Sequence, residues 1–493
     1  MYEPEVAATV EAMPPKAWLV IDKLPTEIQD LIFHYVVMDS TRDELKLFRQ
    51  SNRHFRDRAD SYLFGTLHIS ASNLSLERVR LISENDRLNV HVKELVYHRG
   101  TFSGHKMVRF SGGTHMRPRD YDDFENHLLR TRVSQAHIVR ASKCYDAFIE
   151  EVEAEAAFNR DMLWQTAMRR YCSRFPRLEQ LTTLSDTSEL DSTYLRGRTA
   201  LTHQSWTPNY FAPYEIFEPC GPHFRPKALS LNGVNGEDFA SMITNIRGGL
   251  QAIKERFSEL KMFRLSFSET VSSLEIEGTY DHFVPACTNL CDLSLDFERF
   301  YSPKMLKNSE SFAQKLIKLV LLQRFSRLAS LELTYAPMAE ADLIIFLDRH
   351  QKTLTTLRLH RWPMPVTTER RPTGSVVRAF WRIGKLPLKY LHSVKLSGEF
   401  SNRADGEGWS INGDPGYDRS VYPFPVSPKL IRYLEDGGKN KYEFPLPIST
   451  DAMDDASTGE ALLALDRQSY ALGCSDPTFT WWEDKRFEQP PDA

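Results

Sequence analysis

Apolar residues recur with a helical spacing after Leu24-Pro25, near the start of the chain. Proline suits the first turn of a helix because its ring fixes the backbone angle φ. The apolar positions that follow lie three or four residues apart, which places their side chains on one face of a helix. They are Ile28, Leu31, Ile32, Tyr35 and Val36. The pattern predicts an amphipathic helix that begins at Leu24-Pro25.

Two shorter helices are predicted directly after the first. Residues 41–44, Thr-Arg-Asp-Glu, have the form of a capping box, in which the threonine hydroxyl and the glutamate carboxylate each accept a backbone N–H at the helix start. The apolar residues Leu45, Leu47 and Phe48 follow this box. Ser51-Asn52 can cap a third helix, whose apolar face is formed by Phe55, Ala59, Tyr62 and Leu63.

Between about residue 92 and residue 400 the chain repeats the pattern Leu-x-x-Leu-x-Leu, which places alternate leucines on one face of a strand. Copies with Leu, Phe or Val in the middle end at Leu265, Leu295, Leu333, Leu359 and Leu396. Looser copies are Val92/Leu95/Tyr97 and Leu229/Leu231. Helical periodicity lies between the copies, notably over 239–257 and 342–348, and over 377–381 before Gly384, where a glycine can end a helix. The order predicts an α/β fold of alternating strands and helices, irregular because the interval between copies varies.

On such strands the leucines would enter the core, and the residues between them would face solvent. The charged residues and the histidine of this outward row are therefore candidates for contacting a partner. They are Arg264, Asp292, Asp296, Glu332, Arg358, His360 and Lys395. The acidic members at 292 and 296 and the basic members at 358 and 395 suit a polar partner of mixed charge. An ordinary solvated surface is an equally open interpretation.

Composition and charge exclude several classes of protein. The 493 residues include 41% hydrophobic residues, enough for a sizeable core, and the net charge of −4 gives no general attraction to nucleic acid or anionic lipid. No apolar run approaches the roughly 20 residues of a membrane-spanning helix. The N-terminal residues include acids where a secretory or mitochondrial signal needs basic residues. We expect a cytoplasmic or nuclear protein that binds neither nucleic acid nor membrane.

Catalytic and metal-binding motifs are not recognisable in the sequence. It contains no phosphate-binding glycine loop, no zinc-protease motif and no nucleophile elbow. Cys287 and Cys291 are spaced like a metal-binding pair, but matching ligands are missing, so buried thiols are expected. We therefore expect no catalytic residue, no metal and no cofactor. An enzyme whose site assembles from distant residues remains an open alternative.

The segment LPTEIQDLIFHYVVMDSTRDELKLFRQSNRHFRDRADSYLFGTLHIS resembles an F-box. An F-box opens with Leu-Pro-x-Glu-Ile/Leu, continues with spaced aliphatic residues and closes on a basic residue followed by an aromatic one. The final LFGTLHIS resembles the exit from the F-boxes of the large fungal F-box group. Where many members have Val-Cys before the basic residue, this sequence has Gln50-Ser51-Asn52.

The resemblance implies association rather than catalysis. F-box proteins bind the Skp adaptor, which links them through a cullin to a RING protein and its ubiquitin-charged conjugating enzyme. By this resemblance, the residues that contact the adaptor or support that contact by packing are Leu24, Pro25, Ile28, Leu31, Ile32, Leu45 and Phe48. For Leu31 and Phe48, a role only in the internal packing of the helices is about equally expected.

Together these observations predict an α/β chain with an N-terminal three-helix F-box, followed by an irregular leucine-rich-repeat-like solenoid with a helical insertion. The predicted parts are a disordered tail over 1–17, an F-box-like domain over 18–70, a substrate-binding repeat domain over 71–400 with the insertion at 121–172, a loop over 401–428, and a C-terminal cap and tail over 429–493. A second predicted loop covers 194–226.

The predicted function is substrate recognition in an SCF-type cullin-RING ubiquitin ligase. The helices would bind the Skp adaptor, and the repeats would bind a protein substrate that the sequence does not identify. The alternative is a protein-interaction scaffold with the same F-box and repeats that acts outside a ubiquitin ligase.

Overall fold

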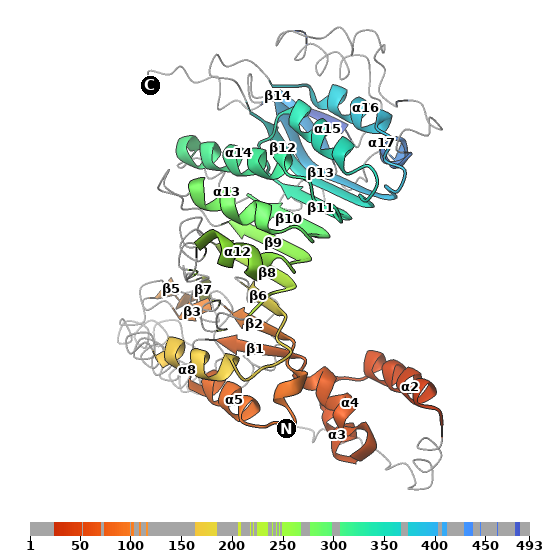
Figure 1. Ribbon diagram of the computed structural model, residues 1–493. Coiled ribbons are helices and arrows are strands. Elements are labelled where there is room, and N and C mark those ends of the chain that lie inside the picture. The colour runs from red at the N-terminus through yellow and green to blue at the C-terminus, as the bar shows by residue number, and fades with distance from the viewer. Residues whose placement is uncertain are drawn as a thin grey trace, which may run out of the picture.

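A large, mainly parallel β-sheet dominates the computed structural model of the chain, which has an α/β architecture (Figure 1). The strands lie one above the next, and three helices project at the end of the sheet nearest the N-terminus. The structure describes residues 24–51, 53–70, 73–98, 100–102, 108–109, 115–116, 163–184, 206–208, 217, 220, 224–234, 239, 243, 246, 249–267, 277–297, 306–365, 373–402, 407–411, 428–436, 444, 461 and 479–483.

The three N-terminal helices begin and end close to the predicted positions. They are α2 (Thr26–Asp39), α3 (Arg42–Ser51) and α4 (Arg53–Phe64). The predicted capping box is confirmed, because the Thr41 N–H donates to Glu44 Oε2 at 2.6 Å and the Glu44 N–H donates to Thr41 Oγ1 at 3.3 Å. The backbone bond from Thr41, followed by that from its side chain, lowers the pKa of Glu44.

A small apolar core holds these helices together, but it does not use the predicted face of α2. Its buried members are Phe33, Leu45, Ala59 and Leu63. Of the α2 side chains that the structure describes, Phe33 and Gln29 are buried. Of the predicted apolar face, Ile28, Leu31 and Tyr35 are exposed, and Ile32 and Val36 are half-buried. The helix has apolar residues on more than one side, and helical spacing alone does not determine which side packs inward. The predicted amphipathic pattern named the apolar positions of α2 but not the side that packs against α3 and α4.

The main sheet has eleven strands among the described residues, and the first nine in its order run parallel. These are β1 (Thr66–Ser70), β2 (Glu94–His98), β6 (Gln180–Leu184), β8 (Ala228–Val234), β9 (Met262–Phe267), β10 (Asp292–Asp296), β11 (Ser330–Thr334), β12 (Thr356–Met364) and β13 (Ser393–Asn402). The last two strands, β14 (Glu407–Ile411) and β15 (Phe479–Glu483), are added antiparallel.

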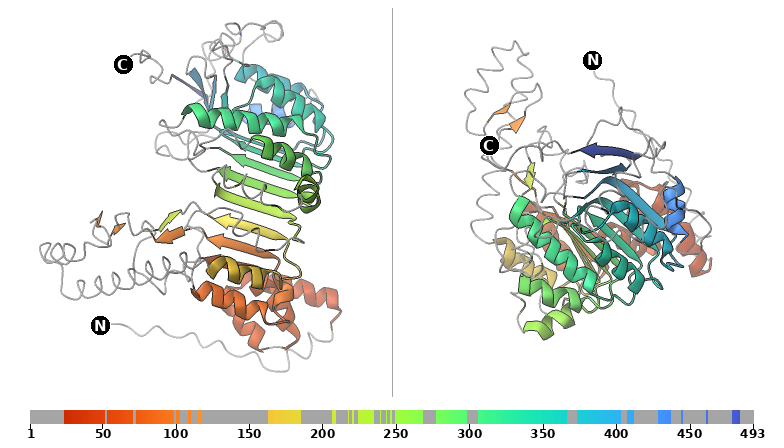
Figure 2. Two further views of the ribbon diagram at one scale, coloured as in Figure 1. Left: turned by 60° about the vertical axis from the view of Figure 1, so that its left-hand side comes forward. Right: turned by 90° about the horizontal axis from the view of Figure 1, so that it is seen from above.

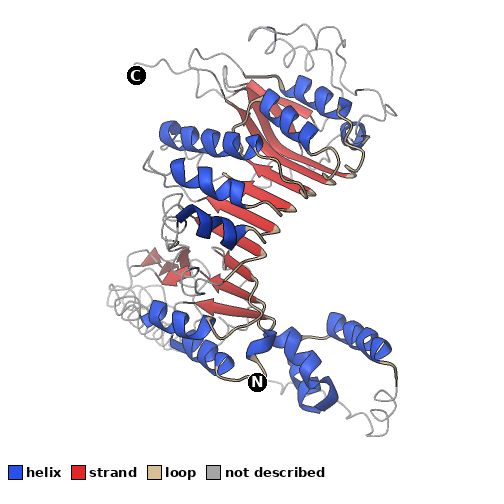
Figure 3. Cartoon of the chain, in the orientation of Figure 1, coloured by secondary structure: helices blue, strands red, loops and turns tan. Residues whose placement is uncertain are grey.

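Helices between successive strands form a layer against one face of the sheet (Figures 2 and 3). They are α5 (Asn73–Ser83), α8 (Leu163–Cys172), α12 (Gly249–Phe257), α13 (Glu277–Ala286), α14 (Leu306–Leu322), α15 (Glu340–Arg349), α16 (Val376–Lys385) and α17 (Pro428–Glu435), with the short 3-10 helix η1 (Asn89–His91) before β2. One continuous core of buried side chains joins these helices to the strands. In the described part of the chain, none of the helices has the length and apolar character needed to span a membrane.

The register of the strands follows the repeated leucine pattern. Leu293 of β10 lies beside Phe263 of β9 and Leu331 of β11. Two positions further along, Leu295 lies beside Leu265 and Leu333. All five complete copies and both looser copies predicted from the sequence are strands. The pattern missed β6, because Thr183 replaces the last leucine. Thr183 is buried, and its hydroxyl accepts the backbone N–H of Asn232 at 2.9 Å.

The same backbone contact recurs before each of these parallel strands. The carbonyl of Gly65, just before β1, accepts the N–H groups of Lys93 and Glu94 at the start of β2, at 2.9 and 3.0 Å. The equivalent carbonyls each accept two N–H groups of the next turn in the same way, and they belong to Lys93, Glu179, Lys227, Lys261, Cys291, Ala329 and Thr355. Successive segments of the chain are thus stacked in one constant register.

The structure extends or corrects the prediction in three further regions. The predicted loop over 401–428 contains the end of β13 and all of β14, which pair antiparallel. The predicted loop over 194–226 contains β7 (Trp206–Pro208), which pairs with β3 (Gly100–Phe102). A further small pair is β4 (Val108–Arg109) with β5 (His115–Met116). Most of the predicted insertion and the tail over 1–17 lie outside the described residues.

Candidate partner-binding surfaces

The first candidate surface consists of large apolar side chains that the three N-terminal helices leave in solvent. Among the described residues of these helices the exposed fractions are 43% for Ile28, 51% for Leu31, 62% for Tyr35, 57% for Leu47 and 50% for Tyr62. We call these five residues the exposed apolar group. The three on α2 share one face by their spacing, and α3 and α4 contribute one residue each.

The predicted adaptor-contact residues divide between this surface and the core. Ile28 and Leu31 belong to the exposed apolar group, Pro25 is exposed at the N-cap of α2, and Leu24 and Ile32 are half-buried. Leu45 is buried in the small core, so its part is packing rather than direct contact. The side chain of Phe48 lies outside the described residues. Sequence reasoning left Tyr35, Leu47 and Tyr62 out of the site, although Tyr35 is seven positions after Ile28 on the same face.

Polar contacts fix how the three helices sit on one another and on the sheet. The buried carboxylate of Asp60 on α4 is paired with Arg49 of α3 and with Nη2 of Arg87 at 3.0 Å. Arg87 follows α5, so it ties the helices to the first segment of the sheet. Within the helices, Arg58 Nη1 donates to Gln29 Oε1 at 3.2 Å. Only Gly65 separates α4 from β1, so the two parts join without a linker.

The second candidate surface is the sheet face opposite the helices. The register places Arg264, Ser294, Glu332, Arg358 and Lys395 in one row across β9 to β13. The residues before and after each of them on its strand are buried in the core, which leaves this row on the open face. Asp296 and His360 lie in a parallel row two positions further along their strands. The structure therefore brings the predicted partner-contact residues onto one face.

Several of these side chains contact one another across neighbouring strands. Arg264 Nη2 lies 2.8 Å from Asp292 Oδ2, and Arg358 Nη1 lies 3.3 Å from Glu332 Oε2. Asp296 Oδ2 accepts the Ser266 hydroxyl at 3.2 Å, and His360 Nδ1 lies 2.7 Å from Ser397 Oγ. Lys395 is exposed. The mixed charges that the sequence indicated are thus partly paired within the sheet itself.

A further polar cluster, which sequence reasoning missed, lies near the other end of this face. Glu94 of β2 accepts Thr66 Oγ1 at 3.0 Å, Gln180 Nε2 at 2.5 Å and Thr182 Oγ1 at 2.8 Å. The four side chains come from three neighbouring strands. The register of β6 was the missing signal, because Gln180 and Thr182 can be assigned to this face only once β6 is recognised as a strand.

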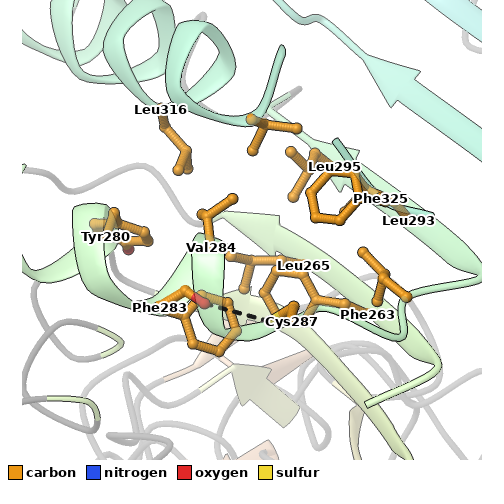
Figure 4. A pocket seen from close by; sticks show the side chains of 12 residues that line it. Phe263, Leu265, Tyr280, Phe283, Val284, Cys287, Leu293, Leu295, Leu316 and Phe325 are labelled. Carbon is orange, nitrogen blue, oxygen red and sulfur yellow. Dashed lines mark hydrogen bonds between the residues drawn. The ribbon is translucent and has the colours of Figure 1, made fainter. Parts of the chain in front are cut away.

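Cysteines of the described part act as packing groups. Cys287 is buried, donates from Sγ to the Phe283 carbonyl at 3.4 Å, and has its pKa raised by burial. Its neighbours line a small apolar cavity between β9–β10 and α13–α14 (Figure 4). Cys291 is half-buried. Across the residues that the structure describes, no three His, Cys, Asp or Glu side chains are grouped as metal ligands.

Comparisons with known proteins supply no relative. No protein-family model matches the chain. A search of curated proteins likewise found no match.

Proposed function

We propose that this chain is the substrate-recognition subunit of an SCF-type cullin-RING ubiquitin ligase. In this proposal α2, α3 and α4 form an F-box that binds the Skp adaptor, and the open face of the sheet binds a protein substrate. The observation that carries the proposal is the exposed apolar group, which coincides with the segment that resembles an F-box.

Exposing the five side chains of the exposed apolar group to water costs free energy, which a partner that covers them would recover. Removing a side chain such as leucine or isoleucine from water is worth about 1.5–3 kcal/mol when burial is complete. Five large side chains on a three-helix unit therefore offer several kcal/mol to an association. The small core beneath them buries Phe33, Leu45, Ala59 and Leu63, and of the five, Tyr62 has a ring contact with Phe33. A helical partner such as the adaptor suits this surface.

We further propose that the sheet and its helices are an irregular leucine-rich-repeat array. The repeated carbonyl contacts before each strand support this interpretation, since they mark structural units stacked in constant register. The buried leucines at equivalent positions support it as well. Such an array presents its strand residues as a broad polar surface, which is suited to binding another protein.

The contacts of Asp60 give the two proposed surfaces a defined relation. Because Arg87 reaches Asp60 and only Gly65 joins α4 to β1, the adaptor-binding helices and the sheet would move as one body. A substrate on the sheet would then be held at a fixed position relative to the adaptor. The bound conjugating enzyme would supply the chemistry of ubiquitin transfer, and this chain would form no covalent bond.

Co-precipitation of the full chain with the Skp adaptor tests the proposal. Leu31→Asp and Ile28→Asp place a charge on the exposed apolar group and should reduce adaptor affinity by about tenfold or more. Leu81→Asp is the matched control, because Leu81 is 55% exposed on α5, outside the N-terminal helices. The control should bind like the unmodified chain. Undiminished adaptor binding by both group variants would contradict the proposal.

The same precipitate distinguishes the ligase from the scaffold. The proposed ligase subunit brings down the cullin together with the adaptor. A scaffold acting outside a ligase would bring down the adaptor without the cullin.

A further inference from the structure

Two cations stand side by side on the open face of the sheet, where no feature of the fold requires them. Arg358 of β12 and Lys395 of β13 are direct register partners on parallel strands. Neighbouring strands lie about 4.8 Å apart, so the two side chains leave the sheet close together. Like charges at directly opposite positions destabilise a sheet. The stability of the fold therefore does not explain why Arg358 and Lys395 lie side by side.

Acidic side chains near this pair compensate it incompletely. Glu332 lies 3.3 Å from Nη1 of Arg358, on the side away from Lys395. The Nε of Arg358 is buried and donates no hydrogen bond to the described residues. Glu435, which α17 brings to the edge of β13, accepts the backbone N–H of Val394 at 3.0 Å and is engaged there. Within the described residues, Glu332 contacts Arg358, and no carboxylate lies within ion-pair distance of Lys395.

Arg358 and Lys395 differ from Arg264, the other cation of this row, because they are register partners of each other. On β9 the cation Arg264 has Ser294 of β10 as its register partner, and it contacts Asp292, two positions earlier on β10, at 2.8 Å. Around Arg358 and Lys395 the flanking rows carry hydroxyl groups instead, since Thr356 pairs with Ser393 in register and Ser397 lies beside His360. Hydroxyl groups can donate hydrogen bonds to an anion. The β12–β13 end of the face is therefore suited to receive a carboxylate.

We propose that Arg358 and Lys395 form a subsite for an aspartate or glutamate side chain in an acidic segment of the protein substrate. The guanidinium and the ammonium would both contact the carboxylate, and the hydroxyls of Thr356, Ser393 and Ser397 would surround it. The entering charge would relieve the repulsion between the two cations. This inference rests on the proposed function only in identifying the occupant as the ligase substrate.

Selection from a random 12-residue peptide library on the full-length chain tests the subsite. Peptides that bind the unmodified chain should be enriched in Asp and Glu. The same peptides should bind the Lys395→Glu variant at least about tenfold more weakly than the unmodified chain, because the variant's carboxylate repels an acidic peptide. The control Lys389→Glu makes the same charge change on an exposed lysine in the turn before β13 and should leave affinity unchanged.

A second variant moves affinity in the opposite direction. Glu332→Gln removes the carboxylate that competes for Arg358, so acidic peptides should bind more tightly, by about threefold or more. Absence of acidic enrichment, an equal loss in Lys389→Glu, or unchanged binding by both Lys395→Glu and Glu332→Gln would overturn the subsite.

Adaptor co-precipitation with Lys395→Glu separates this inference from the proposed function. The variant should retain the adaptor at the level of the unmodified chain. If the unmodified chain itself fails to bind the adaptor, the proposed function fails while the peptide result still decides the subsite.

Discussion

Glu340 is a carboxylate that the fold buries completely and surrounds with donors. It accepts Arg378 Nε at 2.9 Å, Arg382 Nη1 at 3.1 Å and the backbone N–H of Ser375 at 3.0 Å. It thereby joins the start of α15 to the first turns of α16. Buried charges of this kind stabilise a structure only while every partner is present.

Glu340→Gln should lower the free energy of unfolding by about 3 kcal/mol, because it leaves Arg378 without its buried counter-ion. Glu332→Gln is the matched control, since it breaks a solvent-accessible arginine pair and should cost less than about 1 kcal/mol. Urea denaturation of both variants measures the difference. An equal decrease in the free energy of unfolding of the two variants would contradict a larger contribution from the buried Glu340 contacts.

His350 is a buried histidine, and one of its ring nitrogens faces a hydrogen-bond donor while the other faces an acceptor. Nε2 accepts the N–H of Phe325 at 3.0 Å, and Nδ1 lies 2.7 Å from the Phe346 carbonyl. These partners require a neutral ring with its proton on Nδ1. Burial, the largest influence, lowers the pKa of His350 below its usual value.

A lowered pKa in the folded chain makes stability fall in mild acid. The contribution of neutral His350 is complete above the pKa in the unfolded chain, about 6.5, and decreases as the pH falls from there through the lower folded-state pKa. Urea midpoints at pH 7.5 and pH 5.5 test this. The decrease should be smaller in His350→Gln, which cannot titrate; an identical decrease in both proteins would contradict the assignment.

At the scale of elements, Gly384 shows how close packing depends on one residue. It lies inside α16, and a Cβ built there would sit 2.0 Å from Cε1 of Tyr433 on α17. The Tyr433 hydroxyl also donates to the Trp381 carbonyl at 2.8 Å. The sequence suggested that α16 stops before Gly384, whereas the helix runs through it to Lys385.

Gly384→Ala should destabilise the chain by about 1–3 kcal/mol, because the added methyl group displaces the Tyr433 ring. In an exposed helix the same change would stabilise by up to about 1 kcal/mol. Thermal denaturation distinguishes the two signs. Combining it with Tyr433→Leu should reduce the loss below the sum of the single changes, and strict additivity would argue against the contact.

The strands were more predictable from sequence than the faces of the helices. Successive side chains on a strand point to opposite faces, so the leucines of the repeated pattern identify the core face. The pattern therefore located β9 to β13 and their outward residues. Helix α2 carries apolar residues on several sides, and only the positions of α3 and α4 determine that Phe33 packs inward and Leu31 outward. Pairings between strands, such as Arg358 beside Lys395, depend on a register that one strand does not encode.

In the whole molecule, the proposed adaptor-binding helices and the proposed β12–β13 subsite lie at opposite ends of the run of parallel strands. Helices α2 to α4 lie beside β1, and the β12–β13 subsite lies far along the stack of strands (Figure 1). The buried Asp60 contacts fix the helices to the near end. A substrate segment bound at the subsite would therefore be held at a set distance from the adaptor.

Hydrogen exchange of the full chain, measured alone and with purified Skp adaptor, shows whether the adaptor binds the three N-terminal helices. If the adaptor binds α2, α3 and α4, amide exchange over residues 24–64 should be slower in the complex, and exchange in the strands β9 to β13 should be unchanged. Protection confined to the sheet, or no change in exchange anywhere at saturating adaptor, would contradict it.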